Sequence, residues 1–273
     1  MAFSVTDEQV RNFHRDGYLL VPKLFDAEEV DILLTTARND SAMQDHSRDI
    51  EDASGKVSKL TLWNHPGNDV FGLASRCRRV VDTAESLLDD EVYHYHSKLS
   101  MKEPRVGGAW EWHQDYGYWY NNGCLFPDML SCMTALDPAT QQNGCMQVLK
   151  GSHKAGRIQH GVEGEQAGAD LKRVDELAKV LDLVYCEMNS GDSLFFHGNT
   201  LHCSAPNESD DPRWVLISCY NAKSNNPTSA HHHPQYTPLE KVDDSAIKAH
   251  GIRSSDDNQK YMETKLYDKS ESD

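Results

Sequence analysis

The stretch WHQDYGYWY, residues 112–120, places a histidine and an aspartate two positions apart inside a run of aromatic residues. If the stretch is a β-strand, side chains two positions apart point to the same face, so His113 and Asp115 look the same way. An unpaired carboxylate buried among aromatic rings is costly, and the neighbouring residues offer Asp115 no obvious partner. Coordination of a metal ion explains this pair better than packing does.

A third metal ligand is expected on a later strand, within GDSLFFHGNTLHCSAPNES, residues 191–209. This segment offers His197 and His202, and the residues alone leave the choice between them open. Two histidines and one carboxylate on one face of an octahedron leave three positions free. Non-heme Fe(II) oxygenases use this arrangement to bind cosubstrate and oxygen.

Arg213 follows His202 at a spacing of eleven and begins the apolar run RWVLISCYNA, residues 213–222, which predicts a strand. An arginine at that place can hold a carboxylate by two parallel hydrogen bonds. The hydroxyl of Ser204 lies close enough in sequence to bind the same group. Together these residues predict a metal ion with an anchored dicarboxylate cosubstrate.

Composition limits the classes of partner. The chain has 273 residues and a formal net charge of -16 at pH 7, which repels a nucleic-acid backbone. No apolar run approaches the roughly 18 residues that a membrane-spanning helix needs. Seven cysteines without a C-x-x-C pair, and a start without a secretory signal, favour a reducing cytoplasm. We expect a small-molecule substrate, neither nucleic acid nor a membrane as partner, and no particular oligomeric state.

The chain is expected to form one domain, 1–273, that is mainly β with flanking helices. Thr6 and Asp26 are good helix N-caps, Gly17 ends the first helix, and 1–90 is predicted to be largely helical. Many short strands with turn signals follow in 91–222 and favour a sandwich or barrel. Three further segments are expected outside the strands: a loop at 39–56, a charged insertion at 153–181 and a polar extension at 223–273.

Five stretches in this order resemble the phytanoyl-CoA dioxygenase-like (PhyH) branch of the Fe(II)/2-oxoglutarate-dependent dioxygenases, over roughly residues 6–222. They are FHRDGYLLVPKLFDAEEV, WHQDYGYW, NGCMQVLKGSHK, GDSLFFHGNTLHCSAPNES and RWVLISCYNA. The resemblance implies a double-stranded β-helix (a cupin-like jelly roll) in which His113, Asp115 and His202 bind iron. It thereby chooses His202 over His197, and it implies Fe(II), 2-oxoglutarate and O2 as cofactor and cosubstrates.

The resemblance also implies contacts to 2-oxoglutarate. Arg213 is matched to the residue that binds the distal carboxylate, and Ser204 to a serine that contacts the cosubstrate in relatives. Trp119, six residues after the first ligand, and Lys102 match further positions of the family pattern. Ser100 stands where some relatives carry asparagine, so no contact is transferred to it.

The predicted reaction is hydroxylation of a C–H bond in a small soluble zwitterion, with an aminoalkylphosphonate or its N-methylated form as the best candidate. An aromatic cluster can line the pocket or cage an ammonium group, and scattered basic residues can receive an anion. The substrate-binding candidates are Tyr116, Tyr118, Tyr120, Arg105 and Arg157. By default the basic residues, including Lys98 and Lys154, are ordinary surface charges.

Several histidines outside the ligand set are interpreted less specifically. His94 and His96 alternate on a predicted strand and are either packed imidazoles or partners of the ligands, while His231 to His233 are expected to be solvated. Two other functions stay open: hydroxylation of an acyl-CoA or a hydrophobic secondary metabolite, and a non-catalytic metal-binding jelly roll.

Overall fold

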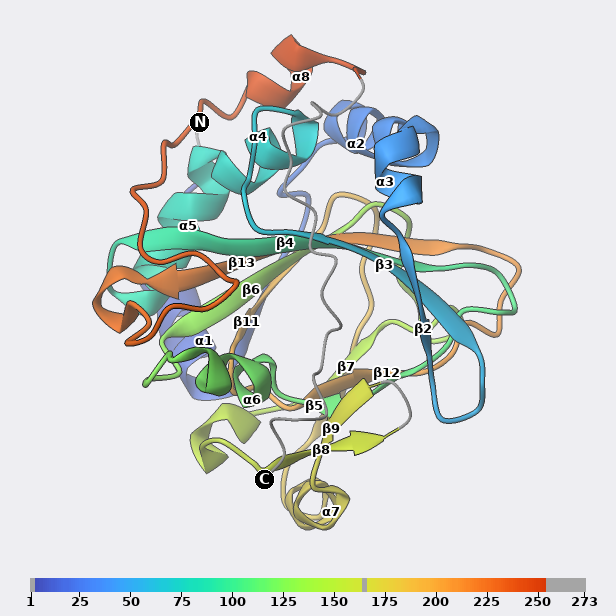
Figure 1. The fold of residues 1–273 in the computed structure, drawn as a ribbon, viewed down its shortest axis with the longest axis vertical. Helices are drawn as coiled ribbons and strands as arrows, with labels where there is room; N and C mark the ends of the chain where they lie inside the picture. Colours follow the sequence, from blue (N-terminus) through green and yellow to red (C-terminus); the bar gives the residue numbers. More distant parts are fainter. Residues whose placement is uncertain (1–2, 164–165, 254–273) are drawn as a thin grey trace.

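Two antiparallel β-sheets face each other in the computed structural model, which describes residues 3–163 and 166–253 (Figure 1). The large sheet contains, in spatial order, β1 (Tyr18–Val21), β11 (Ser193–His197), β6 (Met129–Ala135), β13 (Arg213–Ala222), β4 (Val92–Lys102), β3 (Val57–Trp63) and β2 (Arg48–Glu51). The small sheet contains β10 (Leu183–Cys186), β7 (Met146–Leu149), β12 (His202–Ser204) and β5 (Trp110–His113). The predicted jelly roll with flanking helices is confirmed.

Strand β13 shows how the core is divided. Its residues alternate between the two faces of the large sheet, as a strand buried on both sides requires. Val215 and Ile217 pack into the core between the sheets, whereas Leu216 and Tyr220 pack into the core under the helices. The inner face of the large sheet therefore looks towards the small sheet.

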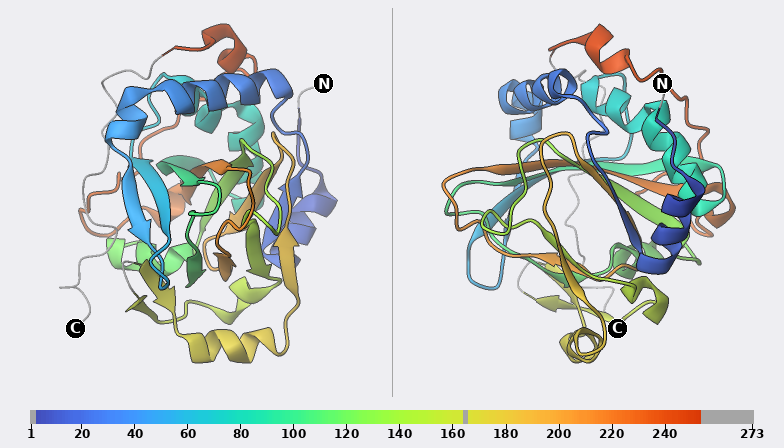
Figure 2. Two further views of the ribbon diagram at one scale, coloured as in Figure 1. Left: turned by 90° about the vertical axis from the view of Figure 1, so that its right-hand side faces the viewer. Right: turned by 180° about the vertical axis from the view of Figure 1, so that it is seen from behind.

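Helices cover the outer face of the large sheet (Figure 2). They are α2 (Ala27–Asn39), α4 (Val70–Arg76), α5 (Arg78–Leu88) and α8 (Ala246–His250). The predicted helix ends are confirmed: the side chain of Thr6 caps α1 (Asp7–Asp16), which ends at Gly17 with φ 84°, and Asp26 caps α2. No helix within the described residues is long and apolar enough to cross a bilayer.

The expectation of a loop at 39–56 is wrong. Asp40 caps a short helix, α3 (Ser41–Asp45), and accepts hydrogen bonds from the backbone amides of Ala42 and Met43. Strand β2 then pairs with β3 at the edge of the large sheet and buries Ile50 alone. An edge strand with one buried residue looks polar in sequence, which is why the pattern predicted a loop.

The insertion at 153–181 packs beyond the small sheet (Figure 1). It comprises most of η2 (Ser152–Ala155), a hairpin of β8 (His160–Glu163) and β9 (Gln166–Ala169), and α7 (Leu171–Ala178). A separate small core, which includes Leu149, Ile158, Val174 and Leu201, holds it in place. The remaining elements are α6 (Asp115–Trp119), η1 (Tyr120–Asn122) and η3 (Lys223–Asn225), while 254–273, within the expected polar extension, lies outside the described residues.

Candidate metal centre and cosubstrate pocket

His113, Asp115 and His202 converge between the sheets. His113 ends β5, His202 begins β12, and the two residues are direct partners in the small sheet. The Nε2 atoms of His113 and His202 lie 3.7 and 3.8 Å from Oδ1 of Asp115. One ligand atom from each side chain lies within 4.8 Å of the others, which suits a single metal ion.

The strand argument that placed Asp115 beside His113 is wrong, although Asp115 does reach the cluster. Strand β5 ends at His113, and Asp115 is the first residue of α6. The chain turns there because the Gln114 side chain donates to the carbonyls of Gly156 and Asn199. Contacts with segments distant in sequence, rather than strand alternation, therefore direct the Asp115 carboxylate towards His113 and His202.

Both candidate histidine ligands are oriented by backbone carbonyls. Nδ1 of His113 lies 2.7 Å from the carbonyl oxygen of Glu111, and Nδ1 of His202 lies 2.9 Å from that of Thr200. A carbonyl accepts only, so each Nδ1 carries the proton and each Nε2 presents a lone pair towards Asp115. Metal-binding histidines are commonly held by such outer contacts.

The charges also suit a divalent cation. Burial alone would raise the pKa of Asp115, but Lys98 and the two imidazoles outweigh it and bring that pKa to about 2. The second carboxylate oxygen accepts a hydrogen bond of 2.8 Å from Ser131. Burial lowers the pKa of both His113 and His202, so a carboxylate and two neutral imidazoles coexist at neutral pH.

His197 lies apart from this cluster. Its Nδ1 accepts a hydrogen bond from the backbone amide of Asn199, and its ring packs against those of Phe13 and His153. These contacts occupy His197 in packing, which agrees with the choice of His202.

A second polar pocket is formed where β13 begins and β4 ends. Arg213 and Lys102 are direct partners in the large sheet, and both side chains are buried. The Lys102 ammonium donates to the hydroxyl of Ser204 at 2.7 Å and to the carbonyl of Ala205. No hydrogen bond to Nε of Arg213 or to the hydroxyl of Ser100 is found among the described residues.

Arg213 and Lys102 are two buried cations side by side, and neither forms an ion pair with a carboxylate among the described residues, so an anion would stabilise both. Burial lowers the pKa of Arg213 to about 10. Burial, and then the charge of Arg213, also lower the pKa of Lys102. A carboxylate in this pocket would pair with the arginine fork and relieve both effects, which fits a dicarboxylate cosubstrate.

The aromatic cluster is divided among different tasks. The ring of Tyr118 lies 5.8 Å from that of the candidate ligand His113. The buried Tyr116 donates its hydroxyl proton to the carbonyl of Cys124, and Trp119 packs edge-on against Tyr95. Among these side chains, Tyr118 lies against the metal cluster.

The three other substrate-binding candidates lie at or near the surface. Tyr120 is 45% exposed, and the guanidinium of Arg157 stacks 4.5 Å from the centre of its ring. Arg105 is exposed and pairs with Asp210 at 2.8 Å. These contacts account for Arg105 without a ligand, whereas Arg157 and Tyr120 form one stacked unit.

Sequence reasoning missed two buried basic residues. Lys98 is not an ordinary surface charge, because its ammonium is largely buried 3.9 Å from Oδ1 of Asp115. Alternation along β4, counted back from Lys102, could have found it. His233 is not solvated either: it is 8% exposed, and its ring stacks on that of Tyr95.

Comparison with known proteins identifies the family. The profile of the phytanoyl-CoA dioxygenase (PhyH) family matches residues 13–215. The chain belongs to this family. This PhyH protein is 30% identical to L-proline trans-4-hydroxylase of Streptomyces griseoviridis, over 85% of the chain and 91% of the relative. It is 28% identical to a probable alpha-ketoglutarate-dependent hypophosphite dioxygenase of Stutzerimonas stutzeri, over 79% of the chain and 78% of the relative.

Solved structures agree with this result. EctD from S. alaskensis with 2-oxoglutarate and 5-hydroxyectoine superposes with a TM-score of 0.70 at 27% identity, over 89% of this chain and 86% of that one. The same enzyme with bound Fe superposes with a TM-score of 0.69 at 25% identity, over 92% and 86%. This PhyH protein is therefore an Fe(II)/2-oxoglutarate-dependent dioxygenase that hydroxylates a small molecule.

Proposed function

We propose that this dioxygenase hydroxylates a small soluble zwitterion that carries an oxyanion at one end and an amine or quaternary ammonium at the other. An aminoalkylphosphonate or its N-methylated form is the specific candidate. The observation that carries the proposal is the largely buried ammonium of Lys98, which lies 3.9 Å from Oδ1 of Asp115 and for which no hydrogen bond is found among the described residues. Such a donor suits an oxyanion placed next to the metal cluster.

The roles of the site residues form part of the proposal. His113, Asp115 and His202 hold the iron, and Arg213 binds the distal carboxylate of 2-oxoglutarate by a bidentate ion pair. Lys102 and Ser204, which are hydrogen-bonded to each other, complete that pocket. Trp119, which the family pattern matches to the cosubstrate, packs edge-on against Tyr95 and His96, so it is not included in this pocket. The support is geometric: each of these side chains except Trp119 presents a ligand atom, an unpaired donor or a hydrogen-bonded pair.

Bound iron would supply the oxidation together with 2-oxoglutarate and O2: one oxygen atom of O2 would enter the C–H bond as a hydroxyl group, and the other would enter succinate as 2-oxoglutarate loses CO2. The protein itself contributes orientation and exclusion of water. Arg213 anchors one end of the cosubstrate, so the other end is directed towards the cluster at His113 and His202. The metal ligands are at most 9% exposed, which keeps bulk water from the reacting C–H bond.

Two further observations favour a zwitterion. The ring of Tyr118 lies beside His113 and can face a cationic ammonium group, because aromatic faces attract cations. The relatives named above act on proline, an amino acid, and on hypophosphite, a phosphorus oxyanion. A net charge of -16 opposes binding of the polyanionic coenzyme A, so an acyl-CoA is the weaker candidate.

A panel of succinate-release assays tests the proposal, with Fe(II), 2-oxoglutarate and O2 present throughout. The panel contains 2-aminoethylphosphonate with zero to three N-methyl groups, L-proline, ectoine, glycine betaine and an acyl-CoA. Stimulation by a zwitterion supports the proposal, and the phosphonate and carboxylate arms identify the oxyanion. Stimulation by the acyl-CoA alone would overturn it.

A further inference from the structure

One ring nitrogen of His96 is buried and accepts or donates no hydrogen bond within the described part of the chain. The residue is 4% exposed, and its Nε2 has no hydrogen-bond partner among residues 3–163 and 166–253. Its other nitrogen, Nδ1, lies 3.1 Å from Nε2 of His233. A buried polar group is normally satisfied, so an open one points to a ligand.

A chain of hydrogen bonds fixes which nitrogen of His96 carries the proton. The amide nitrogen of Asn122 lies 3.2 Å from Nδ1 of His233, and an amide NH2 group can only donate. Nδ1 of His233 is therefore the acceptor, and its Nε2 carries the proton that it donates to Nδ1 of His96. In neutral His96 the remaining proton is then on Nε2. Burial lowers the pKa of both rings, which keeps them neutral.

Register along β4 places His96 on the same interior wall as the candidate metal centre. His96 is the direct partner of Cys219 on β13, which is in turn the partner of Ser131 on β6. Residues paired in this way share one face of a sheet. Because Ser131 donates to Asp115 on that face, His96 belongs to the same interior wall.

Strand β4 also separates two ends of the pocket. From His96 onwards its interior residues are, in order, His96, Lys98, Ser100 and Lys102. Lys102 lies at the proposed cosubstrate end and Lys98 beside the candidate metal ligands, so His96 is on the opposite side, about 20 Å from Lys102 along the strand. Substrate and cosubstrate must approach the metal from different sides, and His96 lies on the substrate side.

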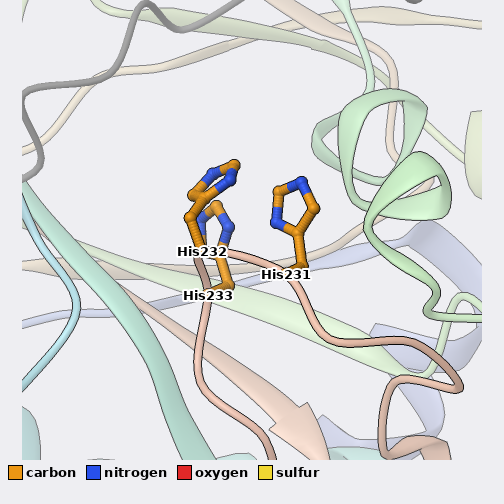
Figure 3. A group of neighbouring side chains, drawn as sticks. All are labelled: His231, His232 and His233. Atoms are coloured by element: carbon orange, nitrogen blue, oxygen red, sulfur yellow. The ribbon is translucent and has the colours of Figure 1, made fainter.

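The neighbouring trio of His231, His232 and His233 could suggest a second metal site, because their ring nitrogens lie within 4.8 Å of one another. Figure 3 shows the three rings on one short piece of loop. Both nitrogens of His233 are already engaged, by Asn122 and by His96. A metal on this trio would have to break one of these bonds, so the contacts favour the role of His233 in orienting His96.

We propose that the Nε2–H of His96 and the ammonium of Lys98 form the subsite for the oxyanion of the substrate, and that His233 is a positioning residue that holds the His96 proton on Nε2. The inference rests on the proposed zwitterionic substrate and names the protein groups that bind its anionic end. A carboxylate and a phosphonate share the required chemistry.

Binding is measured by calorimetry on the full chain loaded with Zn(II) and saturated with 2-oxoglutarate, which fills the arginine pocket. The probes are L-proline, 2-aminoethylphosphonate and methylphosphonate, the last an oxyanion without an amine. His96→Leu should weaken binding on the order of tenfold, whereas His96→Gln, which keeps an N–H donor, should recover most of it. His94→Gln is the matched control, because His94 is on the same strand but bonds to Ser97 and the carbonyl of Asn64 instead.

The outcomes separate this inference from the proposed function. Binding of either zwitterion that His96→Leu leaves unchanged would overturn the subsite and leave the substrate class standing. Binding of methylphosphonate that depends on His96, without binding of any zwitterion, would support the subsite and overturn the substrate class. Binding of none of the three probes would overturn both.

The role of His233 is tested by long-range proton–nitrogen NMR on protein with ¹⁵N-labelled histidine, with the His96 signals assigned from His96→Gln. The wild-type proton should reside on Nε2. His233→Phe keeps a ring to stack on Tyr95 but cannot donate, so it should shift the proton towards Nδ1, and His233→Gln should restore the wild-type pattern. If the proton of His96 resides on Nδ1 in the wild-type protein, the proposed role of His233 is wrong.

Discussion

Arg213 and Lys102 lie directly opposite each other in the pair of strands β13 and β4, and both are buried, with no ion pair to a carboxylate among the described residues. Two cations in this position repel each other and have lost most of their hydration. An anion between them offsets both the repulsion and the lost hydration, so the pocket is suited to bind an anion. The cosubstrate should therefore stabilise the fold as well as take part in the reaction.

Arg213→Ala should raise the KM for 2-oxoglutarate by on the order of a hundredfold, because a bidentate ion pair in a buried pocket is lost. Iron should remain bound at wild-type stoichiometry, since Arg213 does not touch the metal cluster. Titration of the Fe-loaded protein with 2-oxoglutarate measures the first effect, and metal analysis the second. Arg78→Ala, at an exposed arginine, is the control. A wild-type KM in the Arg213 variant would contradict the assignment.

His202→Ala should abolish tight iron binding, because it removes one of three ligands, whereas His197→Ala should retain the metal. The two histidines are five residues apart and both are buried or nearly so. Comparing the two variants therefore distinguishes loss of a metal ligand from a general loss of folding. Metal content after gel filtration measures the result. Full iron stoichiometry in the His202 variant would reject the ligand set.

Gln114→Ala should loosen the insertion and the metal site together. The Gln114 side chain donates to the carbonyls of Gly156 and Asn199 and accepts from the amide of Ile158. Because Gln114 directly precedes Asp115, these bonds connect the start of the insertion to the metal site. Loss of three buried bonds should lower stability by about 2–4 kcal/mol. Limited proteolysis should show faster cleavage within 153–181, and iron affinity should fall. Cleavage at the wild-type rate would mean that other contacts hold the insertion.

The comparison of sequence with structure shows which features are local. The capping residues Thr6 and Asp26 act through hydrogen bonds to amides a few positions away, so their pattern can be read directly. The conformation at Asp115 could not be predicted, because Gln114 bonds to residues 42 and 85 positions away. The histidines and the arginine were found because their spacing matches a known family.

The part of the site facing the substrate was missed for a related reason. His96 and His233 are 137 positions apart, and neither is informative alone. The position of Lys98 depends on which face of β4 turns inwards, and a bulge in β4 at Tyr95, which has no partner in β13, shifts the alternation between His94 and His96. Pairing of strands across the sheet, rather than spacing within one, decides which side chains meet.

Stability should fall as the pH decreases from about 6.5, because buried histidines are neutral in the folded protein. Burial lowers the pKa of His94 to about 3 and that of His197 to about 3. Below pH 6.5 the unfolded chain binds protons at these positions and the folded chain does not, so protonation favours unfolding. At about pH 5.5 each residue should cost about 1 kcal/mol relative to pH 7.5.

Urea unfolding at the two pH values measures this loss. His94→Gln removes one titrating group, so the difference in unfolding free energy between the two pH values should shrink by about 1 kcal/mol in this variant. If the pH dependence of His94→Gln equals that of the wild type, protonation of His94 does not differ between the folded and the unfolded chain. That result would contradict the prediction.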